Sequence, residues 1–556
     1  MSAARDVPGA LMRLLSAVWS RPWLGFVAVF IWAIWQRWQM PWLPLATADS
    51  WGYLGPALYE LSGEGFRQTD GRSPAYPFFL LNVLRATESF PAIAMVQHVI
   101  GLLSGVVWIW VFAQWTAWLP AAVRPRPWVW WLGAGALALY LLGAWAVVYE
   151  TLLRPEAIFP LFAFLQIGCT LAFLRARWSP ASRGRAAVVA AGALAVLSAA
   201  LCVSLKPSWG FAAVVPVAAL LAGIAAAGQP ARRLASALAL VCGLGLALLW
   251  QEGMPYATGW IADDRARTFL PATLFTVHAD MISATRHEEA ARGLLDDEET
   301  AFLAHLDQRL AESRTIDPPK YKVLGHDPDY LMYHSDALAV LPGGAGGTAE
   351  RQAGYFRSAY FAAWRAQPAG MLAKIGRQVL LAHADPPTSL HRSSVPWRVH
   401  FESARGFPSV YPPPALPRQL AAGWDELFRR CSELASTERK RRTFVPALPP
   451  WFHGVGLGAL VGFLTVAGLG VFPAGRWLFR SRPALHPAAR VFAVIVITHL
   501  GMVCTVAVVH SFDIGRYMAL LSPSQSLLVG TGSVLLLAFW SAAWPRPRNP
   551  ARCNAP

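Results

Sequence analysis

The sequence predicts an all-α polytopic membrane protein of about ten transmembrane helices, with one largely helical region outside the membrane. Hydrophobic residues make up 55% of the 556 residues and charged residues only 14%, whereas soluble domains carry about a quarter charged residues. The 26 Trp residues suit the headgroup layer, where an apolar ring with one N–H donor is stable. This composition indicates a chain built for a solvent of low dielectric constant.

Ten apolar runs are long enough to cross a bilayer, which takes roughly 17–25 residues each. The N-terminus is basic, but no small-residue cleavage site follows the first run, so we expect a retained span rather than a cleaved signal peptide. Pro216 interrupts the sixth run, which membrane helices tolerate when neighbours satisfy the freed carbonyl. The runs fall near 17–37, 92–118, 128–148, 156–174, 186–204, 208–228, 234–252, 452–474, 491–510 and 518–544.

The charged residues divide between alternate connections, and this division orients the spans. One set of connections carries arginines with scarcely an acid: Arg124 and Arg126, Arg175 to Arg185, Arg232 and Arg233, Arg476 to Arg490, and Arg546 to Arg552. The other set carries the acids. Because arginine-rich loops stay in the cytoplasm, both termini are predicted to be cytoplasmic, with the loop 38–91 and the region 253–451 outside. The formal charge of +16 then reflects topology rather than nucleic-acid binding.

The region 253–451 is the stretch able to form a water-soluble domain. It lies between an N-terminal membrane module (1–252) and C-terminal membrane helices with a basic tail (452–556). Apolar periodicity predicts a helix within 287–313 and two more at 348–366 and 368–383, with Pro368 at a first helical position. The proline-rich stretch 385–418 predicts extended structure across the membrane face. The basic run 439–442 departs from the charge pattern, which long translocated loops tolerate.

Motifs for metal, nucleotide or disulfide chemistry are weak in this region. Asp327-Pro328-Asp329 looks like the Asp-x-Asp that holds a metal on nucleotide sugars, but the central proline favours a turn. The glycine run 343–347 lacks the Lys-Ser/Thr of a phosphate loop and indicates a linker. The six cysteines show no CxxC spacing, and Cys431 alone lies in the polar region. No disulfide or metal framework is predicted.

The first external loop holds the most informative residues. It contains Asp49-Ser-Trp-Gly-Tyr53 and, further on, Asp70-Gly-Arg72-Ser-Pro-Ala-Tyr76-Pro. A carboxylate directly after a span is costly unless it is solvated, paired or functional. Alone, Asp49 would be explained as the N-cap of a short interfacial helix, and Asp70 to Arg72 as a turn.

Three short connectors add cations on the same predicted face. Glu150 and Arg154 lie between spans three and four, Lys206 between spans five and six, and Arg516-Tyr517 between spans nine and ten. Each cation alone is explained equally well as a snorkelling or headgroup-binding residue. Together with Asp49 and Arg72, they predict a polar cup that is positive enough to hold a lipid phosphate by charge-assisted hydrogen bonds.

These motifs resemble the GT-C glycosyltransferases, which include the protein O-mannosyltransferases and the aminoarabinose transferase of lipid A. The resemblance covers roughly residues 40–230 and, more weakly, 500–530. Family members often show Asp-Glu where Asp49-Ser50 stands, and the region 253–451 matches no family pattern. The matching features are Asp-Ser-x-x-Tyr at Asp49 to Tyr53, Arg-x-Pro-x-Tyr-Pro at Arg72 to Pro77, Pro155-Glu156 at the start of span four, and Arg516-Tyr517 before the last span.

The resemblance implies a GT-C fold in a bacterial inner membrane. It also implies transfer of a sugar from a polyprenyl-phosphate donor to an acceptor glycan, lipid or protein outside the cytoplasm. Asp49 matches the family's catalytic acid and would be the general base. Arg72, Lys206 and Arg516 would neutralise the departing lipid phosphate, so no metal or other cofactor is expected to be required. The other residues expected around the substrate are Tyr53, Asp70, Tyr76, Glu150, Arg154 and Tyr517.

Two other functions stay open. A non-catalytic transporter of lipid or polysaccharide would usually show internal repeats and charges near the bilayer midplane, whereas the charges here lie at the ends of spans. A polymerase or ligase of lipid-linked glycans would also use an external arginine-rich face, but with a polyprenyl-diphosphate donor.

Overall fold

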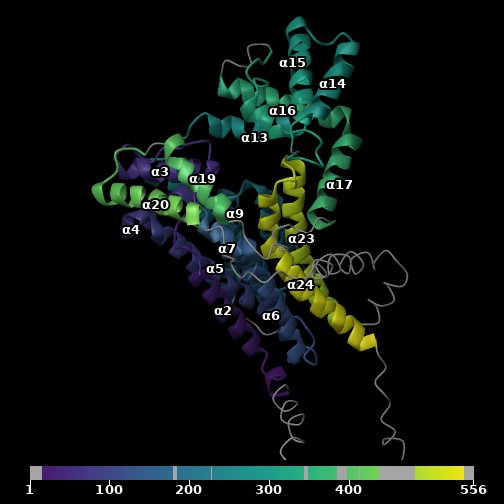
Figure 1. Ribbon diagram of the computed structural model, residues 1–556. Helices are drawn as coiled ribbons and strands as arrows, with labels where there is room; N and C mark the ends of the chain where they lie inside the picture. Colours follow the sequence, from purple (N-terminus) through teal and green to yellow (C-terminus); the bar gives the residue numbers. More distant parts are fainter. Residues whose placement is uncertain are drawn as a thin grey trace, which may run out of the picture.

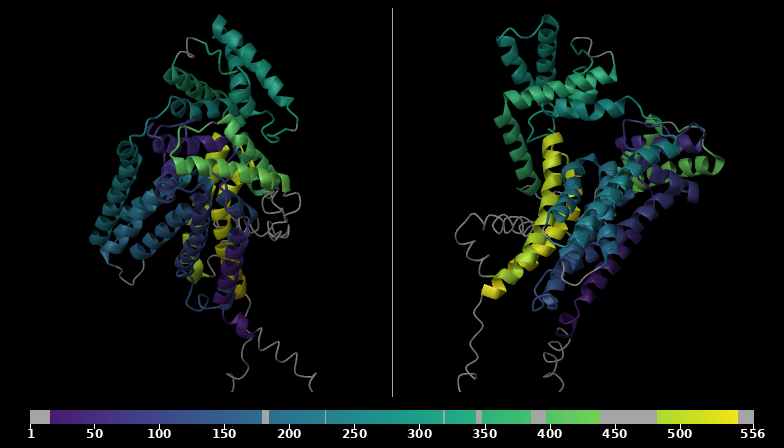
Figure 2. Two further views of the ribbon diagram at one scale, coloured as in Figure 1. Left: turned by 60° about the vertical axis from the view of Figure 1, so that its left-hand side comes forward. Right: turned by 180° about the vertical axis from the view of Figure 1, so that it is seen from behind.

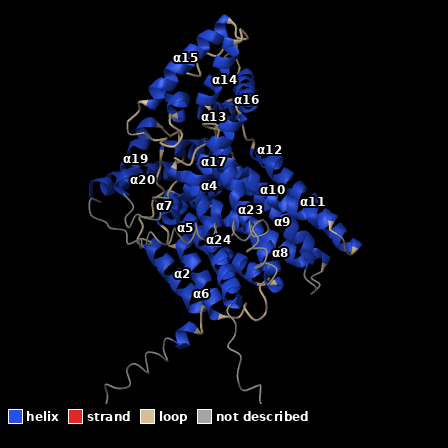
Figure 3. Ribbon diagram, turned by 90° about the vertical axis from the view of Figure 1, so that its right-hand side faces the viewer, coloured by secondary structure: helices blue, strands red, loops and turns tan. Residues whose placement is uncertain are grey.

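The computed structural model describes residues 16–178, 184–226, 228–317, 319–342, 348–384, 397–411, 413–437 and 482–543. Within these ranges the chain is helical, with isolated bridges at Leu45–Leu152 and Arg67–Ile261 and no strand (Figure 3). The all-α prediction is therefore confirmed for the part of the chain that the structure describes.

The N-terminal part combines long apolar helices with several short ones. They are α2 (Trp23–Trp38), η1 (Ala48–Ser50), α3 (Trp51–Leu61), α4 (Ala75–Thr87), α5 (Phe90–Thr116), α6 (Pro127–Leu141), α7 (Ala144–Thr151), η2 (Pro155–Ala157), α8 (Phe159–Trp178), α9 (Arg185–Leu205), η3 (Pro207–Trp209), α10 (Gly210–Ala225) and α11 (Pro230–Leu248).

The rest of the chain begins with a continuation of α11 and ends with two long helices. Its helices are η4 (Leu249–Gly253), α12 (Met254–Thr258), α13 (Arg265–Val277), α14 (Ala279–Ala291), α15 (Asp297–Arg314), η5 (Tyr330–His334), α16 (Ala349–Ala366), α17 (Pro368–Ala384), α19 (Trp397–Val410), α20 (Arg418–Thr437), η7 (Pro483–Leu485), α23 (His486–Val509) and α24 (Gly515–Ala543).

Seven of the described helical segments are long and apolar enough to cross a membrane. They correspond to seven of the ten predicted spans. The first predicted span forms α2, which has only 16 residues, and the third is broken after Leu141 into α6 and α7. The predicted span 452–474 lies outside the described residues. By the length and composition of these helices, the chain is a helical, multi-pass membrane protein.

The long helices form a bundle with two different ends. The start of α2 and the end of α24 lie at one end, and α13 to α16 form a separate group beyond the other (Figures 1 and 2). A hydrophobic cluster in the bundle joins α2, α5, α6, α8, α23 and α24 through side chains such as Trp108, Phe164 and Leu527. A second cluster packs α3, α4, α19 and α20 over the ends of α5, α8, α23 and α24.

The region 253–437 differs from the sequence prediction in two places. The expected helix over 287–313 is interrupted at Gly293, which has a φ of 71°, so α14 and α15 are separate helices. Residues 397–410 form the helix α19 rather than extended structure. Their spacing explains the error, because Phe401, Ala404 and Phe407 form one buried stripe that packs against α20. The glycine run 343–347 and the basic run 439–442 lie outside the described residues.

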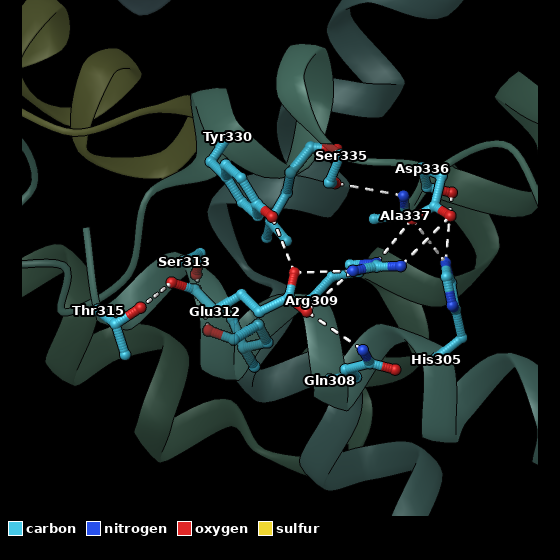
Figure 4. A network of polar contacts seen from close by, with 12 residues as sticks. His305, Gln308, Arg309, Glu312, Ser313, Thr315, Tyr330, Ser335, Asp336 and Ala337 are labelled. Carbon is cyan, nitrogen blue, oxygen red and sulfur yellow. Dashed lines mark hydrogen bonds and ion pairs between the residues drawn. The ribbon is translucent and has the colours of Figure 1, made fainter.

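A polar network ties α15 to the segment around η5 (Figure 4). Arg309 pairs with Glu312 at 2.8 Å and with Asp336 at 2.6 Å, and the Tyr330 hydroxyl donates to Glu312 at 2.8 Å. Asp327 accepts hydrogen bonds from the backbone N–H groups of Asp329 and Tyr330, at 2.9 and 3.0 Å. The Asp-Pro-Asp sequence therefore forms a turn that starts η5.

Candidate functional site

Asp49 lies inside the first helical turn after α2, in η1, which runs directly into α3. Thr47 is the N-cap of this turn, and its backbone N–H donates to the Ser50 hydroxyl at 2.8 Å. The N-cap explanation of Asp49 is therefore wrong, and its carboxylate is left to bind groups outside the helix. Its side chain is 27% exposed, so solvent reaches it.

Arg154 is brought to Asp49 by pairing between two distant backbone segments. The N–H of Leu45 donates to Thr151 O at 2.7 Å, and the N–H of Leu153 donates to Leu45 O at 3.0 Å. The next side chains along each segment then meet, since Arg154 donates to the Thr47 hydroxyl at 3.0 Å and pairs with Asp49 at 2.8 Å.

Arg72 reaches the same carboxylate from a tight turn. Asp70 and Gly71 have φ values of 56° and 65°, and the Arg72 carbonyl accepts a hydrogen bond from Gln68 Nε2 at 2.5 Å. Arg72 then donates to Asp49 Oδ1 at 3.0 Å. It crosses α3 at Gly52, where an added Cβ would lie 2.6 Å from Arg72 Cγ, so a glycine is required at that crossing.

Arg516 arrives from the first turn of α24 and donates to Asp49 Oδ2 at 2.7 Å. The connector that precedes it is fixed by Asp513, whose carboxylate accepts the backbone N–H groups of Val323 and Leu324 at 2.9 and 3.2 Å. The region outside the bundle thus holds the segment that carries Arg516. We call Asp49, Arg72, Arg154 and Arg516 the arginine cluster.

A second ion pair lies next to the arginine cluster. Lys206 Nζ is 2.6 Å from Glu156 Oε1, and the Glu156 side chain is only 2% exposed. Burial alone would raise the pKa of Glu156, but Lys206 and Arg154 lower it and the carboxylate stays charged. Lys206 also acts on Asp49 through space. The two pairs therefore form one electrostatic unit.

The charge of Asp49 is fixed by its surroundings. Burial alone would raise its pKa, but Arg154, Arg516, Arg72 and Lys206 outweigh this effect, so the pKa lies well below the usual range. The arginines are not used up by this carboxylate, because the Nε atoms of Arg72 and Arg516 are buried and have no hydrogen-bond partner among the described residues. Buried donors of this kind are rare unless they serve a ligand or water.

Aromatic side chains surround the arginines. The Arg72 guanidinium lies 5.4 Å from the ring of Tyr53 and 5.3 Å from that of Phe269 in α13, and the Arg516 guanidinium lies 5.2 Å from the Tyr517 ring. The half-exposed Tyr333 of η5 lies within electrostatic range of Arg72 and Asp49. Both α13 and η5 thus reach the arginine cluster from the region outside the bundle.

Three of the residues expected around the substrate lie outside this direct contact. Tyr76 is buried behind Tyr53, with 5.5 Å between the ring centroids, and its hydroxyl donates to Gln97. Asp70 shapes the turn before Arg72. Glu150 is bound elsewhere in the interior, with Arg37 at 2.5 and 2.7 Å and His98 at 2.8 Å from its carboxylate.

A small cavity lies beside the second ion pair, next to the arginine cluster. Its wall includes Tyr149, Glu150, Glu156, Tyr140 and Ser522. Tyr149 and Glu156 connect this cavity to the arginine cluster, because both interact electrostatically with Arg154 and Arg516.

Several functional neighbours were not predicted as site residues from the sequence. Glu156 could have been found, because it stands in the Pro-Glu motif and a buried carboxylate requires a cation. Thr47, Phe269 and Tyr333 carry no local signal, since they reach the cluster only through the packing of distant segments. Arg37, the partner of Glu150, lies 113 residues away in sequence.

Comparisons of the chain with protein-family models, with curated proteins and with solved structures give no match.

Proposed function

We propose that this chain is an integral membrane glycosyltransferase of the GT-C type that moves a monosaccharide from a polyprenyl-phosphate donor to an acceptor outside the cytoplasm. The observation that supports it most is the convergence of three guanidinium groups on one solvent-accessible carboxylate, at 2.7 to 3.0 Å. The carboxylate and the three guanidinium groups come from four separate segments that connect the helices. Such a site suits a charged headgroup attached to a membrane-embedded chain.

The proposed orientation places both termini in the cytoplasm of a bacterial inner membrane and the arginine cluster on the outer face. The described ends of α2 and α24 at one end of the bundle are compatible with it (Figure 2). It requires ten spans, of which α2, the α6–α7 pair and the run 452–474 would supply those beyond the seven long apolar segments.

The charge balance of the site suits a lipid phosphate. Four cations, Arg72, Arg154, Lys206 and Arg516, face two carboxylates, Asp49 and Glu156, which leaves two positive charges. A sugar-linked phosphodiester carries one negative charge and the departing phosphate monoester carries up to two. Since the site matches the charge of the departing group, it stabilises the charge that develops during transfer.

Transfer would be a single displacement. The acceptor oxygen forms a bond to the anomeric carbon while the bond from that carbon to the phosphate oxygen breaks, and the electron pair leaves with the polyprenyl phosphate. The acceptor proton passes to Asp49. This direct displacement inverts the configuration at the anomeric carbon, and general-base help of this kind is worth about 10²–10⁴-fold in rate.

Asp49 as it stands is a poor base, because three arginines hold its pKa far below neutrality. The donor can remove this obstacle. A phosphate bound to Arg72, Arg154 and Arg516 competes with Asp49 for the same N–H groups and adds a negative charge beside it, so the pKa of Asp49 rises toward that of a working base. The carboxylate would thus hold the arginines in place until the donor binds.

The test uses the purified full-length protein with three lipids of equal chain length: polyprenyl phosphate, polyprenyl diphosphate and polyprenol. Native mass spectrometry should show retention of the monophosphate and loss of polyprenol. Preference for the diphosphate would instead support the polymerase or ligase alternative. Retention of polyprenol as strong as that of the monophosphate would remove the phosphate site from the proposal.

Activity is tested in membranes that contain the overproduced protein and a radiolabelled sugar pool. Labelled acceptor should accumulate together with free polyprenyl phosphate, and the yield should persist in chelator. Loss of transfer in chelator with rescue by a divalent cation would overturn the metal-free mechanism. Vectorial movement of the labelled lipid without any bond cleavage would indicate the transporter.

A further inference from the structure

The helix α17 lies beside the membrane helix α23 and runs in the opposite direction (Figure 1). Near its start, Lys374 Nζ donates to the carbonyl oxygens of Ala507 and His510, at 2.6 and 2.7 Å. Near its end, His383 Nε2 lies 3.0 Å from His499 Nε2. Because these contacts are separated by similar lengths on both helices, α17 follows α23 over its second half.

These contacts show how far α17 extends along α23, and therefore how deep it would lie in a membrane that α23 spans. Ten residues separate Val509, the last residue of α23, from His499, which corresponds to about 15 Å at 1.5 Å per residue. The 24 residues of α23 span about 36 Å, against a hydrocarbon thickness of about 30 Å. Even if the whole excess of roughly 6 Å projected at this end, His383 would lie about 9 Å inside the hydrocarbon.

The exposed residues of α17 between 372 and 380 are apolar except for Arg377. Leu372 and Leu380 are 60% and 67% exposed, and Ala373 and Gly376 between them are also exposed. On α23 itself, Ile497 is 55% exposed at the depth of His383. Such leucines would be unfavourable in water, whereas they continue the apolar surface that a spanning α23 presents to lipid.

On the face of α17 toward the bundle, the polar side chains are buried and hydrogen-bonded, as an environment of low dielectric constant requires. Lys374 and Gln378 are 2% and 1% exposed, and Gln378 Oε1 accepts the backbone N–H of Phe512 at 2.6 Å. Polar side chains at membrane depth are tolerated when they face the protein interior and are paired. Arg377 is exposed and can extend along the helix toward the headgroups.

We propose that α17 is a membrane-inserted helix that enters the leaflet on the side of α13 to α16 and ends beside the middle of α23. Its face from Leu372 to Leu380 contacts lipid acyl chains. The region 253–451 is then not wholly outside the membrane, and the group formed by α13 to α16 is fixed to the bilayer through α17.

The test places a nitroxide label at single cysteines in the full-length protein, in a background whose native cysteines are replaced, after reconstitution in liposomes. Leu380→Cys reports the inserted end and Leu372→Cys the entry. Ile497→Cys gives the lipid reference, and Leu294→Cys in the loop before α15, where the side chain is 65% exposed, gives the water reference. Power saturation in oxygen and in a water-soluble nickel chelate measures the depth of each label.

The label at Leu380 should be accessible to oxygen and protected from the chelate, as at Ile497, with a ratio of the two accessibilities several-fold above that at Leu294. The label at Leu372 should give an intermediate ratio. Chelate access at Leu380 equal to that at Leu294 would overturn the proposal. So would low accessibility to both reagents, since that result indicates a protein surface over this face. A photoreactive benzophenone residue at position 380 in native membranes provides a second readout, and lipid adducts are expected rather than protein adducts.

Discussion

Two carboxylate sites near the same end of the bundle are built from the same residue types and are suited to different tasks. At Glu150, one arginine binds both carboxylate oxygens, a histidine adds a third contact, and the Arg37 and Glu150 side chains are only 4% exposed. At Asp49, three arginines share one carboxylate that is 27% exposed. The first site matches one acid with one base in the interior, whereas the second holds surplus cations at a carboxylate that solvent reaches.

The difference indicates that the Glu150 site serves the stability of the fold and the Asp49 site serves ligand binding. A buried, charge-matched pair in a low-dielectric interior has no spare charge for a ligand, and removal of one partner leaves the other buried and uncompensated. An open cluster with excess positive charge and unpartnered buried donors attracts an anion. We therefore expect changes at Asp49 to affect chemistry and changes at Glu150 to affect folding.

The largest expected effect is that of Asp49→Asn on sugar transfer. The amide cannot accept the acceptor proton, so transfer should fall by about 10²–10⁴-fold while the thermal unfolding temperature in detergent stays near that of the parent. Asp297→Asn, the same change at an exposed position in the first turn of α15, is the control. Full transfer by Asp49→Asn would remove the general base from the mechanism.

Glu150→Ala should act in the opposite way. It leaves the Arg37 guanidinium buried without its carboxylate, which costs about 3–5 kcal/mol. It also opens space against Gly101, where Glu150 packs so closely that a Cβ would lie 1.9 Å from its Oε1. Thermal unfolding in detergent should shift down by several degrees. An unchanged unfolding temperature with lost lipid binding would mean that the two sites have exchanged the roles assigned to them.

The sequence predicted the helices better than it predicted which charged residues bind one another. The range 348–366 agrees with α16 at Ala349–Ala366 because side chains three and four apart share a face, and that period is local. Within the range 385–418, the prediction of extended structure failed at 397–410, because the prolines concealed the stripe of α19. The prediction that the cations share one side of the membrane rested on topology alone. That Glu150 binds Arg37, and that Arg154 meets Asp49, depends on contacts between segments more than one hundred residues apart.

Arg72→Ala and Arg516→Ala should each weaken the binding of polyprenyl phosphate. Hydrogen bonds to charged groups are worth about 1.5–3 kcal/mol, which corresponds to roughly 10–100-fold in affinity. Arg67→Ala is the matched control, because Arg67 lies in the same loop but its half-exposed side chain pairs with Glu64 and lies over the Tyr59 ring rather than at Asp49. Titration by native mass spectrometry should separate the two classes. Equal losses for Arg67→Ala and Arg72→Ala would indicate a diffuse surface charge rather than a site.

Gly52→Ala tests the geometry of the open site without removing a charge. The added methyl would lie 2.6 Å from Arg72 Cγ and must push the guanidinium away from Asp49. We expect roughly fivefold weaker lipid binding from about 1 kcal/mol of overpacking. Gly135→Ala in α6 meets nothing within 4 Å and should leave binding unchanged. Unchanged affinity in Gly52→Ala would mean that the position of Arg72 on α3 is not needed.

The smallest expected effect concerns the competition between Asp49 and the donor phosphate. Because the arginines lower the pKa of Asp49 in the folded protein, their stabilising effect is fully present above the ordinary carboxyl pKa of about 3.9. It is lost only as the pH falls through the lower folded value. Between pH 5 and 8 Asp49 therefore stays charged without ligand and holds the arginines against the phosphate. Asp49→Asn removes that competitor, so it should bind polyprenyl phosphate a few-fold more tightly than the parent even though it no longer supports transfer. Calorimetric titration at pH 7 measures this difference. Weaker binding by Asp49→Asn would show that the carboxylate organises the arginines for the phosphate more than it competes with it.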